Sequence, residues 1–227
     1  MSNTVALAGA GGNMGSSVGT NGDLHALSGL RGRWQVACHS GRGWRGVLTR
    51  IRRELYRLAD QRGRHAGRVL RTFGDIIARP ALRWHDRIEN IVVNAGLNYL
   101  LDTGLSAGVA ITTWYLLLTD GTPTVAAGDT MASHAGWVEV TAYSEGVRQT
   151  WTDGGVASQS VDNSASAAVF TISSDTTVVG GAALTSVSTK GGTTGTLYAA
   201  GAFTAGDKSL DTSDTLTVTA TFTAAAA

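Results

Sequence analysis

The chain has 227 residues, 43% hydrophobic and only 15% charged, which is enough for one domain with a substantial core and an appendage. Thirty glycines and two prolines favour a strand-and-turn protein, and the single cysteine excludes an intrachain disulfide framework. The net charge of +1 hides a division that predicts two surfaces with different partners: residues 31–87 carry 15 arginines against 4 acids, whereas residues 88–227 carry 12 acids against 3 bases.

Residues 1–30 are small, polar and rich in glycine, which predicts a flexible N-terminal arm. The stretch "VALAGAGGNMGSS" is similar to a dinucleotide-binding turn, but Met14 stands where a third glycine is needed. We therefore predict no nucleotide cofactor. The N-terminus lacks the basic stretch and long apolar run of a secretion signal. No apolar run in the chain approaches the ~20 residues of a membrane span. The chain is expected to be made in a reducing cytoplasm and to have no membrane partner.

Two alternating stretches, "GRWQVACH" at 32–39 and "ALRWHDRIENIVVN" at 81–94, each carry one tryptophan and predict two strands. With residues 41–80 left out, these strands would form an ordinary antiparallel hairpin. We predict that they pair in one sheet and that 41–80 is an excursion from the hairpin tip. The alternation also predicts that Cys38 is a buried, inert thiol.

The excursion at 41–80 is expected to be a basic helical hairpin. Its first apolar stripe steps by four and three residues, a second stripe is out of phase with it, and a break near Gln61–Gly63 separates them. Pro80 ends the second helix. The two stripes are Trp44, Leu48, Ile51, Leu55 and Leu58, then Ala66, Leu70, Phe73 and Ile77.

The remaining chain predicts one short helix followed by strands. "NAGLNYLLDTGL" at 94–105 favours a helix with Leu97, Leu100 and Leu101 directed inward. Short antiparallel strands with one apolar face build a sandwich, so residues 31–40 and 81–227 are predicted to form a mainly β domain, an antiparallel β-sandwich of jelly-roll type. Its later strands are expected near 111–118, 136–143, 165–172, 177–187, 196–203 and 214–223.

Side chains that carry chemistry do not gather into a recognisable site. The five histidines lack metal-ligand spacing, although His39 and His85 could meet across the hairpin. Asp86 with Glu89, or Glu139 with Glu145, could act as acid and base, but solvated carboxylates explain both pairs as well. Trp114, Trp137 and Trp151 could form a carbohydrate platform, and a core or a subunit interface is the favoured alternative. We predict no enzyme activity, no metal and no cofactor.

The basic excursion at 41–80 has four interpretations: a solvated helical face, nucleic-acid binding, membrane-surface binding, or docking onto an acidic protein surface. Nucleic acid is disfavoured because no binding motif and no interleaved stacking aromatic residues occur. The membrane is disfavoured because the apolar stripe has the narrow spacing of a helix–helix seam. Arginine holds carboxylates with two hydrogen bonds and is enriched at interfaces, which favours a protein partner. The predicted partner-binding residues are Arg45, Arg50, Arg52, Arg53, Arg57, Arg64, Arg68 and Arg71.

Several stretches together resemble a group of small structural proteins of tailed bacteriophages, in which a G-x-W strand leads to a W-x-D strand and then to N-x-V-x-N-x-G-L-N-x-L-L-D. The similarity covers about 31–40 and 81–223 and rests on "RGRWQVACH", "LRWHDRIENIVVNAGLNYLLD", "TTWYLLLTDGTPTVAAGDTM" and "KGGTTGTLYAAGAF". The basic excursion and the N-terminal arm depart from the pattern.

The resemblance implies a β-sandwich virion protein, made in the host cytoplasm and located on the head surface as a decoration or cement protein. Its expected partners are the major capsid protein shell and further copies of itself, as a trimer. A tail or fibre component is the alternative in the same setting, and a glycan-binding or glycan-active protein is the alternative from another class.

Overall fold

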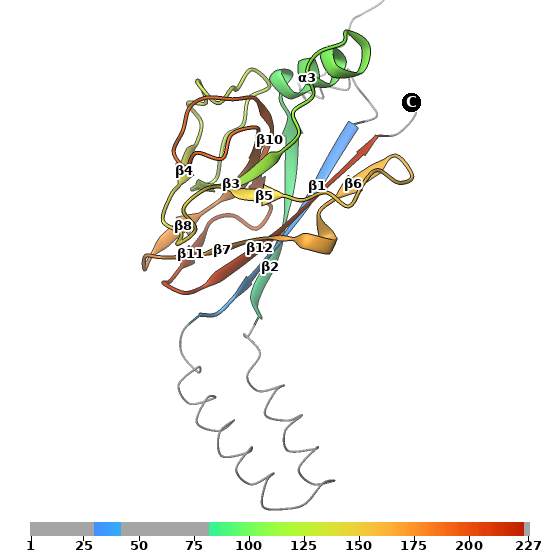
Figure 1. Cartoon of the computed structure of the whole chain (residues 1–227). Helices are drawn as coiled ribbons and strands as arrows, with labels where there is room; N and C mark the ends of the chain where they lie inside the picture. Colours follow the sequence, from blue (N-terminus) through green and yellow to red (C-terminus); the bar gives the residue numbers. More distant parts are fainter. Residues whose placement is uncertain (1–29, 42–81, 225–227) are drawn as a thin grey trace, which may run out of the picture.

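The computed structural model describes residues 30–41 and 82–224. The predicted N-terminal arm apart from Leu30, the predicted helical hairpin apart from Gly41, and all eight predicted partner-binding arginines lie outside these residues. The described part is mainly antiparallel β, as expected (Figure 1). No helix within it is long and apolar enough to cross a membrane.

Each predicted strand range contains or overlaps an observed strand, but the structure has more strands than were predicted. Gly180 divides the predicted 177–187 strand in two, and β5, β6 and β11 were not predicted. Alongside one helix, α3 (Asn94–Leu105), and a 3₁₀ turn at Ser164–Ser166, the strands are β1 (Leu30–His39), β2 (Leu82–Val92), β3 (Trp114–Asp120), β4 (Val138–Val140), β5 (Gln149–Trp151), β6 (Ser160–Asp162), β7 (Ala168–Thr171), β8 (Thr177–Val179), β9 (Gly181–Thr185), β10 (Leu197–Phe203), β11 (Lys208–Leu210) and β12 (Thr215–Ala224).

The first two strands pair although 42 residues separate them in the chain. β1 runs antiparallel to β2, with Trp34 opposite Ile88 and Cys38 opposite Trp84, so the predicted hairpin is confirmed. β12 pairs along the other side of β1 over its whole length. The main sheet of the described residues has the order β4-β3-β9-β10-β2-β1-β12-β6, with β5 also on β3 and β7 also on β12.

This sheet curls until its two edges meet. Beyond β4, Tyr143 forms a β-bridge with Ile172, and the Ser173 amide donates to the carbonyl of Ala142 at 3.1 Å. The inward side chains of β1 and β12 face the enclosed space, because alternate residues of a strand point to opposite faces. Trp34 lies at the centre of this core, fully buried, with its ring edge-on to Phe222 at 5.9 Å.

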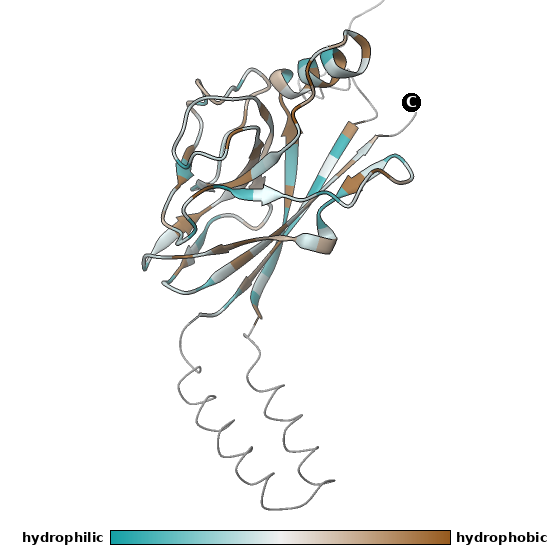
Figure 2. Ribbon diagram, in the orientation of Figure 1, coloured by the Kyte–Doolittle hydropathy of each residue, from teal (hydrophilic) through white to brown (hydrophobic). Residues whose placement is uncertain are grey.

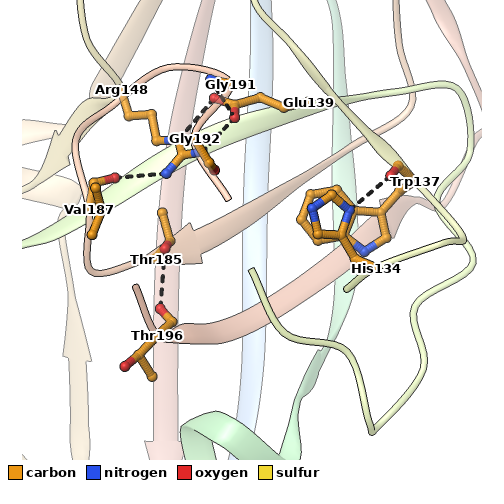
Figure 3. Close-up of polar contacts among 9 residues, drawn as sticks. All are labelled: His134, Trp137, Glu139, Arg148, Thr185, Val187, Gly191, Gly192 and Thr196. Carbon is orange, nitrogen blue, oxygen red and sulfur yellow. Dashed lines mark hydrogen bonds and ion pairs between the residues drawn. The ribbon is translucent and has the colours of Figure 1, made fainter. Parts of the chain in front are cut away.

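A second, smaller core covers the outer face of β3, β9 and β10. Leu117, Ala183 and Ala200 point to this side, and the loop before β4 covers them with Met131 and Trp137. The loop is held by the Trp137 indole, which donates to Asp129 at 3.2 Å. The His134 ring stacks on that indole at 3.7 Å, and its Nδ1 lies 3.0 Å from the Trp137 carbonyl oxygen (Figure 3). β9 is consequently buried on both faces.

Helix α3 forms where it was predicted but with a different face inward. Leu100 and Leu101 are 37% and 52% exposed, so the expectation that they point into the core is wrong. The helix instead packs against β10 at Gly96, where any Cβ would collide with the carbonyl oxygen of Tyr198. Tyr99, three residues on, packs edge-on against Trp114 at 5.2 Å. The close approach at the glycine decides the orientation, because it turns the leucine ridge outward.

Candidate protein-binding face

The outward side chains of β2, β1 and β12 form one polar surface, here called the basic face. Alternation along these strands places tryptophan, valine and cysteine of β1 inside and arginine and glutamine outside. Figure 2 colours the strands by the hydropathy of their residues, which changes along each strand. The basic face comprises Arg31, Arg33, Gln35, Ala37 and His39 of β1, His85, Arg87 and Glu89 of β2, and Thr215, Thr217, Thr219 and Thr221 of β12.

The strand register groups three arginines on this face. Arg33 lies opposite Glu89 on β2 and opposite Thr221 on β12, and Gln35 lies opposite Arg87. Arg31 is two residues from Arg33 along β1, and Arg87 is the diagonal neighbour of Arg33 on β2. Diagonal neighbours across a sheet are within reach of long side chains, at about 7–8 Å. The three guanidinium groups can therefore converge on one bound surface.

These three arginines have no ion-pair partner within residues 30–41 and 82–224. Arg83, the fourth arginine of β1 and β2, behaves differently because it pairs with the buried carboxylate of Asp214. That carboxylate also accepts a hydrogen bond from the Gly41 amide at 2.8 Å. Arg83 thus stabilises the end of the hairpin, whereas the other three guanidinium groups make no such pair with a described residue.

Two adjoining hollows interrupt the basic face. One has a volume of about 200 Å³ and is lined by residues around Ala37, whose small side chain leaves room between its neighbours. The second has a volume of about 400 Å³ and is lined by residues around Gly32. Arg87 lines both hollows. The surface can therefore accommodate protruding side chains of a partner rather than only a flat contact.

The sequence prediction named the eight arginines of the excursion and overlooked those of the strands. Arg31, Arg33 and Arg87 belong to the same basic segment, 31–87, and occupy alternate positions in "RGRWQ" and "HDRIE". The period-two pattern already indicated that they share the solvent face. The pairing of the two strands was needed to place Arg87 beside Arg33.

Of the four carboxylates considered as acid and base, three accept hydrogen bonds from other parts of the domain, and Glu89 is exposed. Asp86 and Glu89 point to opposite faces of β2, one buried and one exposed. Glu139 receives two hydrogen bonds from Arg148, at 3.0 Å from Nε and 2.6 Å from Nη2. Glu145 accepts from the Thr171 amide at 3.1 Å. Asp86 and Glu89 therefore lie on opposite faces of their strand, and Glu139 and Glu145 are each engaged by separate hydrogen-bond donors.

Arg148 and Glu139 form the centre of a buried polar network (Figure 3). The Arg148 side chain is fully buried and also donates to the carbonyls of Val187 and Gly192, at 2.9 and 2.7 Å. Glu139 accepts in addition from the Gly191 amide at 2.9 Å. The pair thus attaches the loop between β9 and β10 to the strands beside it.

The other candidate side chains lie on the basic face or in the two cores. His85 pairs with Ala37 rather than with His39, and no group of three possible metal ligands occurs in the described ranges. Cys38 is buried as predicted, and burial is the main cause that raises the pKa of its thiol to about 12. Trp137 is buried in the smaller core, while Trp114 and Trp151 pair across strands and pack against the main core.

Asp86 of the W-x-D motif stabilises the turn after β10. Its carboxylate accepts from the Thr204 hydroxyl at 2.7 Å and from the Ala205 amide at 3.2 Å, and Lys208 Nζ lies 3.3 Å away. Burial acts to raise the pKa of Asp86, but these hydrogen bonds and the one from the Arg87 amide outweigh it and lower the pKa. The stabilisation is therefore present above the ordinary carboxyl pKa of about 3.9 and is lost as the pH falls below it.

Replacing Asp86 with asparagine should lower the free energy of unfolding by about 1–3 kcal/mol at neutral pH, because four donors lose a charged acceptor. The difference from wild type should shrink in acid, where the carboxyl of the wild type is protonated. Urea denaturation followed by tryptophan fluorescence at pH 7 and pH 3 would measure it. The matched control is Glu89→Gln on the exposed face of the same strand, which should change stability by less than about 0.5 kcal/mol. Equal effects of the two substitutions would contradict the role of Asp86.

Several residues that carry the phage-protein resemblance lie where β1, β2, α3 and the turn after β10 contact one another closely. Gly32 has no side chain because the amide of Asn90 occupies that space, and Gly96 allows α3 to approach Tyr198. Asp86 holds the turn at Thr204. The motif therefore describes how β1, β2 and α3 pack together. The chain has no significant match among protein-family models, curated protein sequences or solved structures.

Proposed function

We propose that this protein is a non-enzymatic structural component of a tailed-bacteriophage particle, a decoration or cement protein on the outer surface of the head shell. The observation that carries the proposal is the basic face, with three arginines that form no ion pair within the described residues, on a β hairpin whose motif residues resemble those of small phage structural proteins. The finer fold assignment, a jelly-roll sandwich with a helical hairpin at 41–80, belongs to the same proposal, as does assembly into a trimer.

The construction of the domain supports a role as a rigid body. The curled sheet encloses its core, and the buried charges of Arg148, Asp86 and Asp214 each stabilise a loop or a strand end. The same hairpin that carries the basic face also carries the excursion at 41–80 in its connection. Both sets of arginines therefore belong to one hairpin, which suits attachment of the domain through that hairpin.

Attachment through arginines requires many contacts at once. An exposed ion pair contributes only about 0–1 kcal/mol, so a stable contact needs several pairs and some apolar burial. Binding to a shell should weaken with salt, because the Debye length falls from ~10 Å at 0.1 M to ~3 Å at 1 M. Electron microscopy of intact particles tests the location directly. Density at regular positions on the shell supports a decoration protein, and density confined to the tail supports the tail or fibre alternative.

Replacing residues 43–79 with a short glycine turn should leave the domain folded, because β1 and β2 remain paired as far as His39 and Leu82. The dissociation constant for purified empty shells should rise about tenfold or more, since all eight predicted partner-binding arginines are removed. Circular dichroism and thermal unfolding check the fold, and sedimentation with shells at 0.1 and 1 M salt measures binding. Unchanged affinity and salt response would show that the excursion is not the anchor, and the N-terminal arm would become the better candidate.

A further inference from the structure

We propose that the basic face itself contacts the shell and that the partner there is an acidic protein surface, whose carboxylates are held by Arg31, Arg33 and Arg87. The inference rests on the proposed function, because it names the partner chemistry of the same protein–shell contact. It adds a surface of the described domain to the arginines of the excursion, and it predicts which side of the curled sheet faces the shell.

The geometry of the three arginines suits carboxylates. A guanidinium group presents a planar fork of donors that matches the two oxygens of a carboxylate, and arginine is favoured at interfaces for this reason. Arg31 and Arg33 alternate along β1, with Arg87 on the adjacent strand. Gln35 and the threonines of β12 lie beside them and can both donate and accept hydrogen bonds. The face thus offers charged donors surrounded by neutral polar groups, as a polar interface does.

The two hollows indicate where the contact is strongest. Interface energy concentrates where a side chain of one partner fills a desolvated pocket of the other, and arginine is enriched at such positions. Arg87 lines both hollows, whereas Arg31 and Arg33 line only the one around Gly32. A partner side chain in either hollow would therefore lie against Arg87. Among the three arginines, Arg87 should make the largest contribution to affinity.

The same face is poorly suited to nucleic acid. Glu89 lies among the arginines, opposite Arg33, so the face is not uniformly positive along the path of a phosphate chain. Trp34 and Trp84 point to the other side of their strands, so within the described residues of β1 and β2 only the imidazoles of His39 and His85 offer a ring on this face. Three arginines opposed by one glutamate provide few phosphate contacts, whereas tight binding to a duplex uses many.

The test compares charge reversals on the basic face with reversals elsewhere, using the full chain and purified empty shells. Arg87→Glu should raise the dissociation constant about tenfold or more, and Arg33→Glu should raise it by less. The control is Thr112→Glu combined with Thr150→Glu, which changes the net charge by the same amount. Both threonines are exposed, neither lies on β1, β2 or β12, and neither lines a hollow of the basic face. The control should bind within about twofold of wild type, because exposed charges outside a contact have small effects.

A second measurement identifies the chemistry of the partner. Arg33→Lys and Arg87→Lys keep the charge and introduce an amine that a carbodiimide can couple to a nearby carboxylate. Cross-linking in the bound state, followed by mass spectrometry, should join each introduced lysine to aspartate or glutamate of the shell protein. Thr150→Lys is the control and should give no such product. An excess of duplex DNA should not displace the bound protein.

The outcomes separate the inference from the proposed function. If the wild-type chain does not bind shells, the proposed function fails, and the proposed partner fails with it. If the wild-type chain binds but Arg87→Glu and the control have equal effects, only the inference fails. Displacement by DNA at equal charge concentration would also overturn it, in favour of a nucleic-acid partner.

Discussion

Replacing Arg148 with methionine is expected to lower the free energy of unfolding by about 3–5 kcal/mol, which is the usual cost of leaving a buried charge without its partner. The Glu139 side chain is only 7% exposed and would keep one hydrogen bond, from the Gly191 amide. The carbonyls of Val187 and Gly192 would lose their donor at the same time. Guanidinium denaturation monitored by tryptophan fluorescence measures the change.

The matched control for this substitution neutralises both partners. The double variant Arg148→Met with Glu139→Gln removes the charge that the single variant leaves buried, so it should be more stable than Arg148→Met alone. A double-mutant cycle with Glu139→Gln gives the coupling between the two side chains. If the single and double variants are equally stable, the pair does not act as a unit, and the loop between β9 and β10 is held mainly by its other hydrogen bonds.

Replacing Trp34 with alanine is expected to cost about 3–5 kcal/mol, the range observed for large aromatic residues in well-packed cores. The Trp34 side chain is fully buried, and it packs edge-on against Phe222 of the adjacent strand. Strands β2 and β12 flank it on both sides, so neighbouring backbone cannot easily move into the space. The cavity should therefore remain largely open. Thermal unfolding followed by circular dichroism would show the loss.

Gln35 provides the comparison for Trp34 because it is the next residue on the same strand and points to solvent. Gln35→Ala should change the free energy of unfolding by less than about 0.5 kcal/mol. Trp34→Phe should lie between wild type and Trp34→Ala, since it retains part of the aromatic volume. Equal losses for Gln35→Ala and Trp34→Ala would mean that the strand, rather than the tryptophan, determines the stability at this position.

The period-two alternation was sufficient to assign the inner and outer faces of the long strands. Leu216, Val218, Ala220 and Phe222 of β12 are buried, as the sequence predicted. The same reasoning did not find β5, β6 and β11, because three residues are too few to show a period. It also did not separate β8 from β9, whose continuous apolar character arises from burial on both faces.

Helix α3 shows why a helical pattern does not by itself identify the buried side. Leucines at 97, 100 and 101 form an apolar stripe, and such a stripe normally faces the core. The contact that positions the helix is the approach of Gly96 to Tyr198, a residue more than one hundred positions later in the chain. Its location depends on where β10 runs, so no local pattern indicates it.

The sequence by itself determined the β class, the hairpin of β1 and β2 across the excursion, the burial of Cys38 and the separation of basic from acidic regions. These features follow from local alternation, glycine and proline placement, and charge counts. Only the tertiary structure decided that Arg87 lies beside Arg33, that Glu139 and Arg148 form a buried pair, and that α3 turns Leu100 and Leu101 outward. Each of these depends on long-range strand register or on one close contact, and a register shift of a single residue would turn every side chain of a strand to its other face.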